Sequence, residues 1–212
     1  MLHRYHRTRV RNFVQNATEF GFFLQMDRFL DAQASGGSHS LQVLLNVIYL
    51  IGAKLSSNPQ VQANEQRYLT RALQQIPTST ALHSDPGSAI YVMQAEVLLA
   101  NYFFVGNRQL EGTYHTTAAV SIAIASRLHL IRSGRRSRPA TEPTAYRLPP
   151  PADVLEEGER INGFWTVFIL DRCWSIASGS APAFTDDEST GTQIDTPWPK
   201  DLTSYQTVSP CL

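Results

Sequence analysis

INGFWTVFILDRCWSIASGSAP, residues 161–182, is the stretch that decides the fold. Its large apolar side chains recur at the three- and four-residue spacing of an α-helix. One face of that helix would carry Ile161, Trp165, Phe168 and Arg172, and another would carry Phe164 and Asp171. The charged pair in the middle of the run would be costly to bury without partners. We therefore expect its two side chains to point in different directions and to reach separate partners.

The expected partners of this pair lie in the chain that follows it. They are the amides of the turn at residues 179–182 or the acidic stretch Asp186-Asp187-Glu188. In this interpretation four residues form a structural clasp that pins the C-terminal tail onto the helices, namely Asp171, Arg172, Asp186 and Asp187. The alternative is that the buried pair contacts a ligand.

The composition is that of an ordinary globular protein. The chain has 212 residues, of which 42% are hydrophobic and 17% charged, and this size suits one hydrophobic core. The formal net charge is zero, but residues 1–150 hold 15 basic and 8 acidic side chains, whereas residues 151–212 hold 3 and 10. This asymmetry indicates either charge complementarity between the two parts or a basic surface for a polyanion.

The sequence disfavours disulfide-rich, zinc-cluster, secreted and membrane-spanning proteins. The two cysteines, Cys173 and Cys211, cannot build a disulfide framework or a zinc cluster. The basic N-terminus lacks the apolar core of a signal peptide, and no apolar run looks long enough to span a bilayer. We therefore expect a soluble intracellular protein with no membrane partner.

Helical periodicity recurs along the chain, and strand-like alternation is nearly absent. The apolar stripes that mark the expected helices are Leu41, Leu44, Leu45, Ile48 and Leu55, then Tyr68, Leu69, Ala72, Leu73 and Ile76, then Ala89, Met93, Val97, Ala100 and Phe104, and then Tyr114, Ala118, Ile122, Ala125 and His129. Short turns between such helices produce antiparallel hairpins. The predicted fold is all-α, with antiparallel helical hairpins packed as a bundle or short solenoid and an extended C-terminal tail.

The boundaries of these helices carry recognisable signals. Asn58-Pro59 and Asp85-Pro86 look like N-caps followed by proline, Pro77 is expected to end the second helix, and Gly106-Asn107 to form a turn. In the last helix, Asp153 and Glu156 have the spacing of a capping box.

Two segments are expected to lie outside the helices. Residues 131–152 are rich in Arg, Pro, Ser and Thr and are predicted to form a flexible loop. Their basic cluster is either solvated or a nuclear-import or phosphate-binding patch, and it comprises Arg132, Arg135, Arg136 and Arg138. Residues 183–212 are predicted to form the extended tail, with Trp198 as an anchor.

Two stretches resemble the fungal-specific transcription factor domain, the all-helical middle homology region of zinc binuclear-cluster (Zn2Cys6-type) regulators. The first spans residues 106–130 and matches the family at Glu111, Gly112, Tyr114, Ala118, Ala119, Ala123, Leu128 and His129. The second spans residues 157–199 and matches at Glu157, Glu159, Arg160, Phe164, Trp165, Leu170, Asp171, Arg172, Gly179, Pro182, Asp186, Asp187 and Pro199. The segment GFFLQMDRFL, from Gly21, is similar to the family's opening segment.

The chain departs from the family pattern in two respects. Gly179-Ser180-Ala181-Pro182 stands where the family has Gly-Arg-Pro, so the contact of that arginine is not carried over. The cysteine-rich DNA-binding cluster is also absent, and the chain ends soon after Pro199. We therefore expect a partial domain over 1–212, from a fragment or a degenerate gene. The resemblance implies zinc only for the missing cluster of full-length relatives, and no cofactor for this chain.

The resemblance implies a nuclear regulatory domain that modulates transcription through a conformational change dependent on a partner or a small molecule. Its partners would be proteins of the transcription machinery, a second copy in a homodimer, and DNA only through the missing N-terminal zinc cluster. The alternative is a helical-hairpin adaptor for protein interaction, unrelated to transcription.

No enzyme is expected, because the sequence shows neither a Gly-x-Ser-x-Gly elbow nor a phosphate-binding glycine loop. His3 and His6 have metal-ligand spacing without a third ligand, and Thr190 interrupts the acidic stretch at 186–188 where a terpene-cyclase metal motif needs an acid. His115 and His129, far apart on one expected helix, are interpreted as structural or exposed.

Overall fold

The structure is a computed structural model that describes residues 9–36, 38–79, 88–132, 148–187, 189 and 191–206. Within these ranges the fold is built from helices and contains no strand, which confirms the all-α class. A helical segment at 9–14 precedes α2 (Met26–Ala34), α3 (His39–Lys54), α4 (Pro59–Gln62), α5 (Glu65–Ser79), α6 (Ser88–Val105), α7 (Gln109–Ala125), the 3-10 turn η1 (Leu128–Leu130), α8 (Val154–Ser178) and α9 (Leu202–Gln206).

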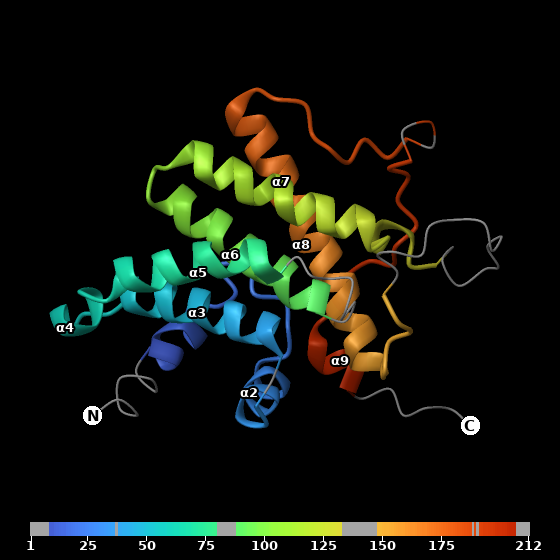
Figure 1. The fold of residues 1–212 in the computed structure, drawn as a ribbon. Helices are drawn as coiled ribbons and strands as arrows, with labels where there is room; N and C mark the ends of the chain where they lie inside the picture. Colours follow the sequence, from blue (N-terminus) through green and yellow to red (C-terminus); the bar gives the residue numbers. More distant parts are fainter. Residues whose placement is uncertain are drawn as a thin grey trace.

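Two antiparallel helical hairpins form the body of the molecule (Figure 1). Helix α3 packs against α5 and α6, and α6 packs against α7 along most of its length. The chain reverses direction between α6 and α7 at Gly106 and Asn107, and Asn107 takes the left-handed conformation with a φ of 57°. Helix α8 crosses the second hairpin and contacts both α6 and α7. The predicted hairpin architecture is therefore confirmed.

Side-chain caps fix where several helices begin. The Asn58 side chain accepts a hydrogen bond from the Gln60 N–H at 2.9 Å, and Pro59 occupies the first helical position of α4. The Asp153 carboxylate accepts the Glu156 N–H at 2.7 Å and caps α8, while the Glu156 side chain reaches back to the Ala152 N–H. Both predicted caps are confirmed.

Helix α6 is the centre of the core and is buried on nearly all sides, rather than along one stripe. Fifteen of its eighteen residues are buried, including Val92, Met93 and Val97. By length and composition it could also cross a membrane, contrary to the expectation from sequence that no segment would qualify, yet 83% of that stretch is buried within the protein. Burial of this extent is typical of the core helix of a globular domain.

Four residues assigned to apolar stripes do not lie in the core. Leu55, Leu73, Tyr114 and Ala125 are exposed, and Tyr114 retains 67% of its accessible surface. Leu55 is the C-cap of α3 rather than part of its buried face. Tyr114 projects from the outer side of α7, where it contacts the ring of His115 edge-on. An i, i+4 pattern cannot show which end of a stripe a neighbouring helix covers.

Several helix boundaries also differ from the prediction. Helix α5 continues to Ser79, past Pro77, so the predicted end at this proline is wrong. Helix α7 ends at Ala125, so that His129 lies in the separate turn η1. The Asp85-Pro86 signal and residues 133–147 of the predicted loop lie outside the described residues.

The C-terminal segment runs back along α8, from its end toward its beginning (Figure 1). We call residues 180–206 the strap. Between Ser180 and Asp201 its described residues are largely irregular, and the strap then forms α9, a short helix within the tail that was expected to be extended. Tyr205 of α9 packs on Gly158 of α8, where an added Cβ would lie 2.5 Å from the tyrosine ring.

Candidate functional site

The C-terminal half of α8 presents the charged pair to the strap. Asp171 is buried, with 7% of its surface exposed. It lies inside α8, where the backbone N–H groups of the helix are already bonded and cannot satisfy its carboxylate. Its oxygens accept hydrogen bonds from the backbone N–H groups of Ala183 at 3.0 Å and Phe184 at 3.2 Å. The buried carboxylate is therefore satisfied by the strap itself.

Arg172 also contacts the backbone of Phe184, through the carbonyl group of that residue. Its Nη2 donates to the carbonyl oxygen of Phe184 at 2.6 Å, and its guanidinium lies over the Phe168 ring, 5.1 Å from the ring centre. Asp171 and Arg172 thus converge on the backbone of Phe184, whereas the sequence led us to expect separate partners. The backbone groups that they contact, at Ala183 and Phe184, also lie just after the predicted turn at 179–182.

Asp186 and Asp187 form hydrogen bonds within the strap itself. Asp186 accepts the backbone N–H of Ile194 at 2.8 Å and has a positive φ of 54°. Asp187 accepts both the N–H and the hydroxyl of Ser189, at 2.8 and 2.9 Å. The structure therefore brings together two of the four residues of the predicted clasp, while the other two shape the turn that follows.

Phe184 is the residue that the sequence reasoning missed. It is completely buried, and its ring meets Phe164 edge-on at 5.4 Å between ring centres and lies 6.1 Å from Phe168. We call Phe164, Phe168, Asp171 and Arg172 the strap site. The available signal was a lone aromatic in an otherwise polar and small-residue segment, ASGSAPAFTDD, directly after the long helix.

Further along, the strap is fixed by backbone and tryptophan contacts. Asp195 donates its N–H to the His129 carbonyl at 2.7 Å, and its own carbonyl accepts the N–H of Arg132. Trp165 Nε1 donates to the Pro197 carbonyl at 2.6 Å, and the Trp198 ring stacks on Trp165. Trp198 is nevertheless 73% exposed, so it covers the surface of α8 rather than inserting into the core.

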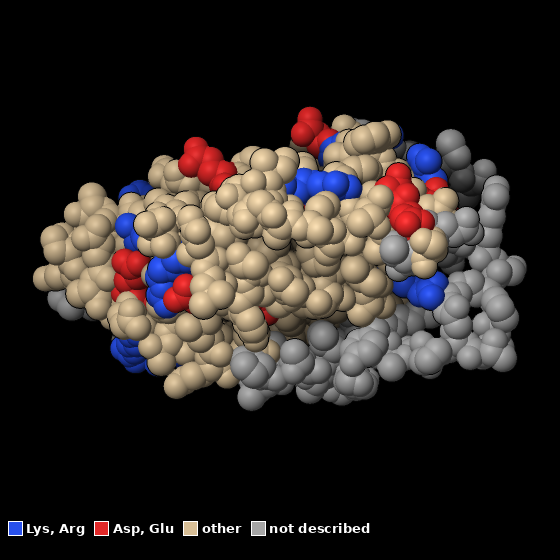
Figure 2. Space-filling view, turned by 90° about the horizontal axis from the view of Figure 1, so that it is seen from above, with Lys and Arg blue, Asp and Glu red and all other residues tan. Residues whose placement is uncertain are grey.

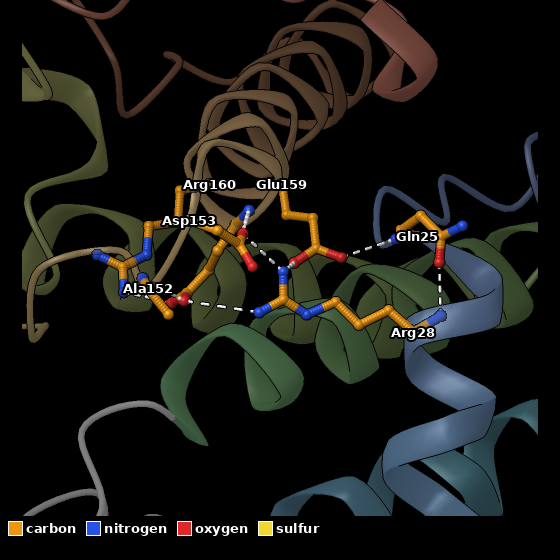
Figure 3. Close-up of polar contacts among 7 residues, drawn as sticks. Gln25, Arg28, Ala152, Asp153, Glu159 and Arg160 are labelled. Atoms are coloured by element: carbon orange, nitrogen blue, oxygen red, sulfur yellow. Dashed lines mark hydrogen bonds and ion pairs between the residues drawn. The ribbon is translucent and has the colours of Figure 1, made fainter. Parts of the chain in front are cut away.

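A second polar cluster joins the start of α8 to the segment before α2 (Figure 3). The buried Glu159 carboxylate accepts the Gln25 N–H at 2.8 Å, and the Gln25 side chain caps α2 by accepting the Arg28 N–H. Arg28 then reaches across to α8, where its Nη1 donates to Asp153 at 2.9 Å. Figure 3 shows Arg28 extended between the two helices, with its guanidinium among the acidic side chains.

The electrostatics of this cluster differ from residue to residue. Burial raises the pKa of Glu159, and the Gln25 N–H and Arg28 only partly offset that effect. The Glu156 N–H and then Arg28 hold the pKa of Asp153 below its usual value. Burial alone lowers the pKa of Arg28, but the hydrogen bond to Asp153 and the nearby carboxylates outweigh it and raise the pKa. The sequence placed Glu159 in the first part of the last helix without revealing this partner.

The histidines do not assemble a metal site. Within the described ranges no group of three His, Cys, Asp or Glu side chains could hold a metal ion. His115 is buried beside Glu96, and His129 Nε2 lies 3.2 Å from the Gly191 carbonyl, so both belong to the packed interior. Burial lowers the pKa of His129. His3 and His6 lie outside the described residues, as does Cys211, while Cys173 is exposed.

The surface charge is mixed on the face drawn in Figure 2. Basic and acidic side chains lie there in small groups, in places side by side, and most of the face carries no charge. The described residues on this face therefore form no extended basic surface of the kind that a polyanion would need.

Comparison with known proteins gives one match. The model of the family described as fungal specific transcription factor domain matches residues 5–207. Searches of curated proteins and of solved structures found no match.

Proposed function

Because the chain belongs to the fungal specific transcription factor domain family, we propose that it modulates transcription through a conformational equilibrium of its helical bundle. The match over residues 5–207 carries this proposal, since it extends from the helices before α2 to the end of α9. The family is one of transcription factor regulatory regions and not of enzymes. We propose that this chain likewise has no catalytic activity of its own.

The strap is the element that we propose to move. Of its described side chains only Phe184, Thr192 and Thr196 are buried, and hydrogen bonds to the strap site, to η1 and to Trp165 hold it on the bundle. Segments held by few buried side chains open at lower free energy than the core does. A protein partner or a small molecule that binds one arrangement of the strap better would shift the equilibrium toward it.

We propose nuclear proteins of the transcription machinery as partners, DNA contact only through a zinc cluster of the family's kind, and self-association as a further option. The second candidate function, a helical-hairpin adaptor without a role in transcription, is favoured by the largely uncharged face in Figure 2. The two candidates differ in whether the chain changes the output of a promoter.

The test is reporter transcription from the chain fused to a heterologous DNA-binding module. We expect the fusion to change reporter output relative to the module alone, and Asp171→Ala, which loosens the strap, to alter that change. Glu19→Ala, which removes an exposed carboxylate before α2, serves as the matched control. Stable expression of the fusion with no effect of either sign would contradict the proposed function and favour the adaptor.

A further inference from the structure

The strap site holds its segment as a receptor holds an extended peptide. Asp171 accepts the N–H groups of Ala183 and Phe184, and Arg172 donates to the carbonyl of Phe184. All of these contacts are with backbone atoms, which almost any peptide could supply. The Phe184 ring fills the space beside Phe164 and Phe168. This division, with backbone bonds for affinity and one side-chain pocket for selectivity, is common in peptide recognition.

The segment that fills the site is bounded by two glycines with positive φ. We call the described residues between them, 180–187 and 189, the flap. Gly179 precedes it with a φ of 67°, Gly191 follows it with a φ of 70°, and a Cβ added at either would meet no atom within 4 Å. Such residues turn the chain at little steric cost.

Within the flap, Phe184 is the one buried side chain among the described residues. Further polar contacts of the flap include those from Thr185 to Thr192 and from Asp186 to Ile194, near its C-terminal end, and the bond of the Ser180 N–H to the Ser175 carbonyl at its start. Withdrawal of one aromatic ring and three backbone hydrogen bonds would therefore open the site without unpacking the helices.

The site also retains a donor that the flap does not use. Arg172 Nε is buried and has no hydrogen-bond partner among the described residues. A buried N–H without an acceptor is costly, and a different occupant could satisfy it.

From these contacts we propose that the strap site docks an extended segment of a protein partner, and that Phe184 occupies the site in cis until such a segment displaces it. The segment carries an aromatic residue. Neither that residue nor the one before it is proline, because both must donate an N–H to Asp171. The inference deepens the proposed function by naming the class of partner, and it rests on that function only for its effect on transcription.

The test uses a labelled synthetic peptide of residues 178–187, SGSAPAFTDD, and the full chain. We expect the chain with Phe184→Ala to bind this peptide at least about tenfold more tightly than the wild-type chain, because the flap without its aromatic ring competes less well for the site. The same peptide with alanine at the position of Phe184 should lose this binding. Adding Asp171→Asn to the Phe184→Ala chain should weaken it about tenfold, because a neutral amide is the poorer acceptor. Equal binding by wild-type and Phe184→Ala chains would overturn the proposal.

A second measurement covers the case in which Phe184→Ala does not fold. In the wild-type chain, hydrogen exchange at the Ala183 and Phe184 amides should become faster when the peptide is added at millimolar concentration, while the Asp195 amide stays protected. Unchanged exchange at the two flap amides would overturn the proposal as well.

The two proposals fail separately. If the chain binds the peptide but has no effect on the reporter, the result supports the docking site and contradicts the proposed function. If the chain changes the reporter output but does not bind the peptide, the result supports the proposed function and contradicts the docking site.

Discussion

His115 Nδ1 lies 2.6 Å from Glu96 Oε2, and each side chain exposes only 4% of its surface. The contact joins α7 to α6, and the imidazole is stacked on Phe103 from α6. Neither partner could be placed there alone, because a buried carboxylate or imidazole without a hydrogen bond is costly. The pair therefore fixes the register between the two helices of the second hairpin.

The first prediction concerns this buried pair. His115→Leu leaves the Glu96 carboxylate buried without its partner and should lower the free energy of unfolding by about 3–5 kcal/mol. The double variant Glu96→Leu/His115→Leu removes both polar groups and should cost less than the single variant does. Urea unfolding measures both, with His39→Leu at an exposed position of α3 as the control. If Glu96→Leu is measured as well, additive costs of the two single changes would contradict the pairing.

The second prediction concerns the carboxylate of the strap site. Asp171→Ala leaves the Ala183 and Phe184 N–H groups without an acceptor and Arg172 without its neighbouring charge. We expect a loss of about 2–3 kcal/mol, measured by thermal or urea unfolding. Glu19→Ala should change the stability by no more than about 0.5 kcal/mol. A loss as small as that for Asp171→Ala would argue against a structural clasp.

The third prediction separates the ring of Phe184 from its backbone. Phe184→Ala keeps the backbone contacts of the flap but removes the fully buried ring, and it should cost about 3 kcal/mol in urea unfolding. Phe184→Leu keeps most of the apolar contact and should cost less than half as much. Equal losses in the two variants would show that the ring does not fill the site.

The fourth prediction is a pH dependence that arises from Glu159. Burial raises its pKa in the folded state above the ordinary value of 4.5, so the folded protein binds this proton more tightly than the unfolded chain does. The contribution of this proton to the free energy of unfolding is fully present below about pH 4.5 and is lost as the pH rises through the folded-state pKa.

Glu159→Gln removes this loss, and its amide oxygen can still accept the Gln25 N–H. The stability of the variant relative to wild type should therefore increase between about pH 4.5 and pH 7 in urea unfolding. The depressed pKa of Asp153 has the opposite sign and acts at lower pH, where stability falls as its carboxylate is protonated. Parallel curves for variant and wild type above pH 4.5 would contradict the burial effect.

Local signals in the sequence predicted the helices because they depend on residues close together in the chain. Asn58 and Asp153 each cap the first turn of the helix that follows them. Gly106-Asn107 reverses the chain at its own position. Exposed Leu73 and Tyr114 were assigned to the core because periodicity reports a face without reporting what covers it.

The strap site was predicted only in part, because a local pattern does not report which residues pack against it. A charged pair inside an apolar run indicates that partners exist, and the sequence placed them in the following segment. It did not distinguish the amides of Ala183 and Phe184 from those of the turn before them, nor from the carboxylates of Asp186 and Asp187. A shift of one residue along an extended chain exchanges the side chains that point inward and outward.

The sequence by itself determined the all-α class, the order of the hairpins, the caps of α4 and α8, and membership of the family whose model matches residues 5–207. Each of these follows from the spacing and type of neighbouring residues. Only the tertiary structure decided that Phe184 fills the site beside Asp171 and Arg172, that Glu159 meets Gln25, and that Glu96 meets His115. These contacts join residues 12 to 134 positions apart, and their partners are selected by the way the helices pack, which no local pattern records.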